Sequence, residues 1–207
     1  MANTSNTPPV KETATHAPIL PRSHVTKALV AGSGAVGKTT LVRVLRDGQP
    51  LNESNVNKEY HRTPFIELET IKVERIGGTG SRGIFLLVDV AGQLDLPIHA
   101  LRDLSKLALG GVELVILVFS AEDIQSLLDL KDWVSLIKTQ YKEVPGKTLQ
   151  FVLVMNKCDL GSCMDPELVA RFIESEPMIS EYFELSCANG EGISELQSWL
   201  VENVSGE

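Results

Sequence analysis

The sequence predicts an α/β fold, in which a mostly parallel sheet of six strands carries helices on both faces. Continuous apolar runs at residues 84–88, 114–119 and 149–155 are typical of strands that are buried on both sides. Helical apolar patterns alternate with these runs, which favours parallel strands joined by helical crossovers. The 207 residues are 43% apolar, which is enough for one well-packed core.

The first elements are a strand at 25–31 and a helix at 39–47. Gly48 follows the last apolar position of this helix and is expected to end it. Residues 49–63 are polar and irregular, so they are expected to form a long loop.

An antiparallel strand is expected at one edge of the sheet. Residues 65–73 alternate between apolar and polar side chains, as a half-buried strand does. A glycine-rich turn at 77–81 connects them to a buried strand at 83–90, which predicts a hairpin.

The second half of the chain supplies three helices and the last three strands. Asp165 and Pro166 are typical of a helix start, and residues 183–185 are expected to form a short last strand. Apolar residues at helical spacing predict one helical stripe between the strands at 114–119 and 149–155, and a closing helix. The stripe consists of Ile124, Leu127, Leu128, Val134 and Ile137, and the closing helix of Ile193, Leu196, Trp199 and Leu200.

A phosphate-binding loop joins the first strand to the first helix. Residues 32–39 read GSGAVGKT, which fits G-x-x-x-x-G-K-[ST]. The glycines let backbone N–H groups turn toward a phosphate, and the following helix directs its positive end to the same anion. Lys38 can reach the outer phosphates, and the Thr39 hydroxyl can bind Mg²⁺.

Polar clusters follow three buried or terminal strands, at 89–93, 156–159 and 186–188. Ligands of such sheets bind at the carboxyl ends of the strands, so these clusters are expected to meet the phosphate-binding loop at one rim. Asp89 can hold Mg²⁺ through water, and Gln93 can orient an attacking water. Asp159 can accept hydrogen bonds from two adjacent N–H donors of guanine, which adenine lacks.

The order of these motifs resembles that of the small GTPases of the Ras superfamily. The loop at 32–39, a switch-I threonine, D-x-x-G-Q, N-K-x-D and S-x-A cover residues from about 25 to 203. The resemblance implies the P-loop NTPase G domain fold. Thr63 best matches the switch threonine, and Thr70 is a weaker alternative inside a strand pattern. The motif details mix Ras and Rab features with Arf-like ones, so no subfamily is assigned.

The resemblance also implies the residues of a nucleotide site. Gly92 would offer an N–H to the terminal phosphate, Asn156 and Lys157 would brace the base pocket, and the Cys187 N–H would donate to the guanine carbonyl. Family members usually place a phenylalanine over the guanine where this chain has Val56, and Tyr60 is a candidate substitute. The nucleotide-binding set is Gly32, Ser33, Gly34, Ala35, Val36, Gly37, Lys38, Thr39, Thr40, Tyr60, Thr63, Gly92, Asn156, Lys157, Asp159, Leu160, Ser186, Cys187 and Ala188. The catalytic set is Gln93, Lys38 and Thr63, and the metal ligands are Thr39, Thr63 and Asp89.

Composition excludes several other classes of partner. The net charge of −8 disfavours nucleic acid and an electrostatic grip on anionic lipid. Three cysteines without a C-x-x-C pair do not predict a disulfide framework or a zinc site. No apolar run reaches the roughly 18 residues of a membrane span, and no signal peptide or lipidation motif is visible. We therefore expect a cytoplasmic protein with a disordered polar tail at 1–23 and a G domain at 24–207.

Two functions remain open at this level. The first is a switch that binds GTP and GDP with Mg²⁺ and hydrolyses GTP slowly. Such a switch would present switch I and switch II to effectors, an exchange factor and a GTPase-activating protein, in signalling, trafficking or polarity. The second is a nucleotide-binding scaffold with little turnover. Gln93 favours the switch, because scaffold-type relatives often lose that glutamine. A P-loop kinase is a minor third interpretation.

Two further hypotheses concern switch residues. Arg62 adjoins the proposed switch threonine and can stabilise charge on the γ-phosphate, although a solvated loop arginine is the simpler interpretation. Leu94 and Leu96 can form a GTP-dependent apolar patch for a protein partner.

Overall fold

The fold comes from a computed structural model that describes residues 25–51, 66–74, 82–90, 109–141, 148–161 and 163–203. The tail predicted at 1–23 and the irregular loop predicted after residue 51 lie outside these ranges.

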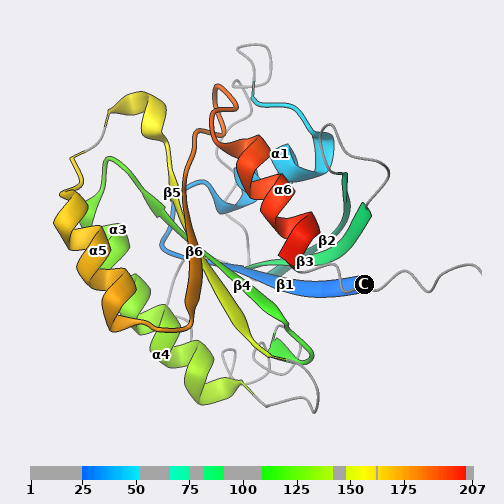
Figure 1. Cartoon of the computed structure of the whole chain (residues 1–207), viewed down its shortest axis with the longest axis horizontal. Coiled ribbons are helices and arrows are strands. Elements are labelled where there is room, and N and C mark those ends of the chain that lie inside the picture. The colour runs from blue at the N-terminus through cyan, green and yellow to red at the C-terminus, as the bar shows by residue number, and fades with distance from the viewer. Residues whose placement is uncertain are drawn as a thin grey trace, which may run out of the picture.

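A single six-stranded sheet runs through the described part of the chain (Figure 1). Its strands lie in the order β2-β3-β1-β4-β5-β6. Only β2 runs antiparallel to its neighbour, and it lies at one edge as predicted. The strands are β1 (Val25–Ala31), β2 (Ile66–Glu74), β3 (Arg82–Val90), β4 (Leu114–Ser120), β5 (Gln150–Asn156) and β6 (Ile179–Glu184).

Helices cover both faces of this sheet, so the predicted fold class is confirmed (Figure 1). The side chains of a strand alternate between the faces. Ala28 and Val30 of β1 therefore pack with α1 and α6, whereas Leu29 and Ala31 pack with α3, α4 and α5. The helices are α1 (Lys38–Asp47), α3 (Ile124–Leu128), α4 (Leu130–Gln140), α5 (Pro166–Ser175) and α6 (Ile193–Asn203), with a 3-10 turn η1 at Cys158–Leu160.

Helix ends agree with the local signals in the sequence. Gly48 ends α1 with φ of 65°, and its N–H donates to the Val44 carbonyl, the geometry that favours glycine after a helix. Asp165 directly precedes Pro166, the first residue of α5, and caps this helix by accepting a hydrogen bond from the Glu167 N–H.

The predicted stripe between β4 and β5 is confirmed in part, because the chain forms two helices, α3 and α4, that meet at Asp129. Asp123 caps α3 with its side chain, and α3 ends after five residues. Ile124 is 41% exposed and Leu128 is 39% exposed, whereas Leu127, Val134 and Ile137 are buried in one core. The spacing of apolar residues alone does not show this break.

The last strand is also longer than predicted, spanning six residues at Ile179–Glu184. Its side chains are half-buried or exposed, since β6 lies at the other edge of the sheet. A strand without a buried apolar face gives a weak signal in the sequence. Within the described ranges, no helix combines the length and apolar character needed to cross a membrane.

Candidate functional site

The phosphate-binding loop lies between the carboxyl end of β1 and the start of α1. Two of its glycines are required by space. A Cβ on Gly32 would lie 2.1 Å from the Val118 carbonyl oxygen, and a Cβ on Gly37 would lie 2.2 Å from Asn156 Nδ2. Gly37 also has φ of 97°, in the left-handed region that favours glycine. The loop is thus packed closely against β4 and β5.

Lys38 begins α1 and is directed back over the loop. Its ammonium group donates a 2.8 Å hydrogen bond to the Ser33 carbonyl oxygen, and the residue is only 7% exposed. Burial lowers the pKa of Lys38 to about 8, while the nearby Asp89 carboxylate opposes that shift. An anion such as a phosphate would stabilise the charged form of this lysine.

Thr39 and Asp89 come together from α1 and β3. The Thr39 hydroxyl donates a hydrogen bond to Asp89 Oδ2, and Asp89 is 2% exposed at the penultimate position of β3. A hydroxyl and a carboxylate beside a phosphate-binding loop are the oxygen ligands that Mg²⁺ prefers. These two residues therefore fit the predicted metal site. Thr40 follows in the same first turn of α1.

Asn156 connects the phosphate-binding loop with the loop that follows β6. Its Nδ2 donates to the Val36 carbonyl at 2.9 Å, and its Oδ1 accepts from the Cys187 N–H at 3.2 Å. Both hydrogen bonds are buried, so Asn156 holds two loops that are far apart in the sequence against the end of β5.

The other predicted base-site residues gather around η1. Ser186 donates its hydroxyl to Asp159 Oδ1, and the same hydroxyl oxygen accepts from the Ala188 N–H at 3.1 Å. Lys157, with φ of 68°, turns the chain between Asn156 and Asp159. Leu160 ends this turn and is largely exposed. The structure thus brings the N-K-x-D and S-x-A motifs together.

The Cys187 N–H differs from the sequence-based expectation. We expected this N–H to donate to guanine, and it donates to Asn156 instead. Its thiol lies in the core between the sheet and α6, and burial raises the pKa of Cys187 to about 12. The residue holds the loop in place with both its main chain and its side chain.

Several predicted residues lie outside the described ranges. These are Val56, Tyr60, Arg62, Thr63, Gly92, Gln93, Leu94 and Leu96. Two described contacts were missed by sequence reasoning. Lys157 forms a 2.6 Å ion pair with Glu122, and Ser33 donates to Asp129 at 2.7 Å. Neither carboxylate belongs to a motif, so no local pattern indicated them.

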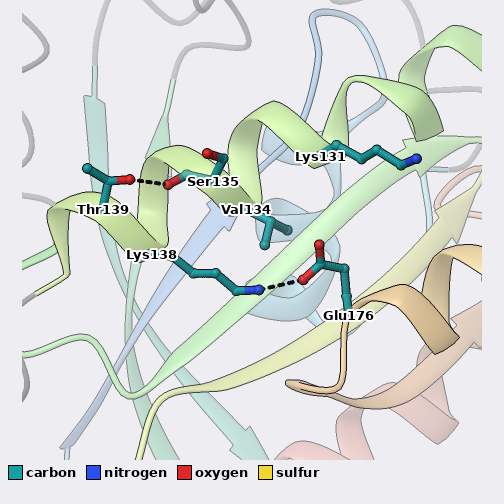
Figure 2. Close-up of a pocket in the computed structure, with 6 residues that line it drawn as sticks. All are labelled: Lys131, Val134, Ser135, Lys138, Thr139 and Glu176. Carbon is teal, nitrogen blue, oxygen red and sulfur yellow. Dashed lines mark hydrogen bonds and ion pairs between the residues drawn. The ribbon is translucent and has the colours of Figure 1, made fainter.

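A surface pocket lies between α4 and the chain that follows α5 (Figure 2). Figure 2 shows Lys138 of α4 paired with Glu176, at 2.5 Å, while Lys131 points away from that pair. None of the predicted nucleotide-site residues that the structure describes lines this pocket. It is separate from the site at the strand ends.

The fold and the geometry of the site define a P-loop GTPase G domain, the class of the small GTPases. Residues 27–206 match the model of the Ras family, and the chain belongs to this family.

Curated relatives agree with that assignment. The chain is similar to Ras-related protein Rab-34 of Homo sapiens, with 26% identity over 174 residues that make up 83% of this chain and 60% of that protein. It is 30% identical to the Intraflagellar transport protein 27 homolog of Bos taurus over 136 residues, which are 65% of this chain and 66% of the relative. The aligned residues thus span 60% of the length of the human Rab-34 protein.

Proposed function

We propose that the chain binds GTP and GDP with Mg²⁺ and hydrolyses GTP slowly, as a switch that presents different surfaces in its two nucleotide states. The observation that carries this proposal is the Asn156 bridge between the phosphate-binding loop and the loop after β6. The bridge supports the proposal because it joins the predicted phosphate and base subsites at one end of the sheet, as a nucleotide that spans both would require.

Guanine specificity would come from Asp159. Its Oδ1 is oriented by the Ser186 hydroxyl, which leaves the carboxylate in a defined position. Ser186 is in turn held by its loop, since its oxygen accepts from the Ala188 N–H. A fixed carboxylate accepts two parallel hydrogen bonds from guanine, and a site built for these donors rejects a base that lacks them.

The phosphates would be held by the loop and by Lys38. The loop residues Gly32–Thr39 lie at the start of α1, where backbone N–H groups and the helix dipole favour an anion. Mg²⁺, held by Thr39 and Asp89 with Thr63 as a further ligand, would neutralise charge on the outer phosphates. Lys38, already buried beside the loop, would add a second positive charge.

Hydrolysis would use a water oriented by Gln93. The water attacks the γ-phosphorus, the bond to the β-phosphate oxygen breaks, and GDP and phosphate are released. A Cβ on Gly34 would meet no atom of the described residues within 4 Å, so none of these residues fills the space beside Gly34 where this chemistry would take place. Small GTPases that lack an arginine of their own turn over at roughly 10⁻⁴ to 10⁻³ per second, and a partner's arginine can add about five orders of magnitude.

The first experiment identifies the base. Nucleotide released from the purified protein by heat should be GDP or GTP. The Asp159→Asn variant should shift preference toward xanthine nucleotides, because the exchange reverses one hydrogen-bond polarity. Unchanged guanine preference in this variant would remove Asp159 from the pocket.

The second experiment separates an enzyme from a scaffold. Single-turnover phosphate release is measured for wild type and Gln93→Leu at matched GTP occupancy. We expect bound GTP in both and a large loss of hydrolysis in the variant. Equal rates would mean that Gln93 is not catalytic, and a nucleotide-binding scaffold would then be the better description.

We extend the proposal to partners and to domain organisation. Ras-family proteins act through regulators and effectors, and we propose that switch I and switch II serve these partners here. The name Intraflagellar transport protein 27 homolog describes a transport protein, which favours a role in trafficking. A G domain at 24–207 with a polar tail at 1–23 remains our proposed organisation. Proteolysis that leaves a nucleotide-binding fragment starting near residue 24 would support it.

A further inference from the structure

We propose that Asp129 is a positioning residue for the phosphate-binding loop and acts through the hydroxyl of Ser33. Ser33 Oγ donates a 2.7 Å hydrogen bond to Asp129 Oδ2, across 96 positions of sequence. The inference rests on the proposed nucleotide-binding function. In it, the junction of α3 and α4 helps to position the phosphate-binding loop for the nucleotide.

The hydroxyl of Ser33 is not required by the phosphate-binding motif itself. In G-x-x-x-x-G-K-[ST] this position accepts any residue, because the loop holds phosphate with backbone N–H groups and the lysine. The Ser33 side chain is therefore available for another contact. In this chain it is used to attach the loop to a helix junction.

Asp129 lies where a carboxylate normally serves its own helix. An aspartate at the start of a helix usually accepts a hydrogen bond from the N–H groups of the first turn. The Asp129 side chain makes no such cap bond to α4. Its Oδ2 accepts from Ser33, and its Oδ1 accepts from Gln125 Nε2 at 2.7 Å. The carboxylate is thus directed at the phosphate-binding loop and oriented by α3.

The junction is a rigid support for that carboxylate. Leu127 and Leu130 on either side of it are fully buried, and Trp133 packs in the same core. The Asp129 main chain belongs to both helices, since its N–H donates to the Gln125 carbonyl at 2.9 Å and its carbonyl accepts from the Trp133 N–H at 3.3 Å. A movement of Asp129 would require repacking of the core.

Ser33 is held from its other side by Lys38, whose ammonium group donates to the Ser33 carbonyl at 2.8 Å. A phosphate would compete for that ammonium group, and the link to Asp129 would then remain to orient the Ser33 backbone. The next residues are Gly34 and Ala35, and Ala35 has φ of 61°. Because Ser33 leads directly into this turn, its orientation sets where the following N–H groups point.

The test is the rate at which a fluorescent GDP leaves the Mg²⁺-loaded protein, for wild type, Ser33→Ala, Asp129→Ala and the double variant. Each single variant should release nucleotide about tenfold faster, the factor for loss of one hydrogen bond to a charged group. The double variant should be no faster than the singles, because both remove the same contact. Asp132→Ala, an exposed aspartate of the same helix, is the matched control and should match wild type.

A conservative variant separates positioning from a general loss of structure. Ser33→Thr keeps the hydroxyl, so its rate of GDP release should fall between those of Ser33→Ala and wild type. If Asp129→Ala does not fold, Ser33→Ala and Ser33→Thr carry the comparison, because they change only a loop side chain. Release at the wild-type rate in Ser33→Ala, or effects of the two single variants that multiply in the double variant, would overturn the inference. Absence of guanine-nucleotide binding by wild type would instead overturn the proposed function.

Discussion

Replacement of Asn156 by alanine is expected to separate the two halves of the nucleotide site. The side chain is 2% exposed and makes two buried hydrogen bonds, with the Val36 carbonyl and the Cys187 N–H. Alanine leaves both main-chain groups without these partners. An unsatisfied buried polar group costs about 1–3 kcal/mol, so the loss in unfolding free energy should be about 2–4 kcal/mol after partial hydration.

Nucleotide affinity should fall as well, since the same side chain holds the phosphate-binding loop. A tenfold weaker affinity lowers the apparent stability of the GDP-bound protein by a further 1.4 kcal/mol, approximately. Urea unfolding at saturating GDP and Mg²⁺ gives the sum of the two effects. The dissociation constant for GDP, measured separately, gives the binding part, and the difference is the folding part.

The chain provides a fluorescent reporter on each face of the sheet. Trp133 packs in the core formed with α3, α4 and α5, and Trp199 packs against the other core. Coincident transitions of fluorescence and circular dichroism would support two-state unfolding.

Asn203→Ala is the matched control for this prediction. It removes the same side chain from an exposed position at the end of α6, where Nδ2 donates to the Trp199 carbonyl at 3.1 Å. Its effect should stay within about 0.5 kcal/mol. If Asn156→Ala costs no more than Asn203→Ala, the bridge does not contribute to stability, and the reasoning is refuted.

The same geometry leads to three further predictions. Chelation of Mg²⁺ by EDTA should speed GDP release markedly, because Thr39 and Asp89 supply oxygen ligands beside the loop; equal release rates with and without EDTA would contradict this metal site. Gly34→Val should keep the fold and nucleotide binding while slowing GTP hydrolysis. Gly32→Val should instead unfold the protein or abolish nucleotide binding, because a Cβ at residue 32 would overlap the Val118 carbonyl. Similar melting temperatures for these two variants would be the contrary result. A thiol reagent should modify exposed Cys163 first and Cys187 slowly. Burial raises the pKa of Cys187 to about 12 and thiolate is the reactive form, so the rate at Cys187 should rise about tenfold per pH unit between pH 8 and 11. A Cys187 rate that is flat over this range would contradict its burial.

Local patterns predicted most of the elements that position the site. The apolar runs of β3, β4 and β5 agree with the structure to within a residue or two, and the glycine-rich hairpin signal correctly indicated β2 as the antiparallel edge. The limits of β6 were poorly predicted, since an edge strand has no buried face to impose an apolar period.

The class of this protein follows from its sequence alone. The residues of each motif lie close together along the chain, and their order places them at the carboxyl ends of successive parallel strands. That rule needs only the strand positions, which apolar runs and glycines reveal. The convergence of Lys38, Asp89, Asn156 and Ser186 was therefore predictable without knowledge of the tertiary structure.

How the motifs are held is a property of the tertiary packing. The Ser33 hydroxyl bonds to Asp129 over 96 positions, and Lys157 pairs with Glu122 over 35. Contacts of this kind depend on where the junction of α3 and α4 lies in the folded chain and on the packing of fully buried neighbours such as Leu130. No periodicity encodes such a placement, because it follows from how the whole core fills its volume.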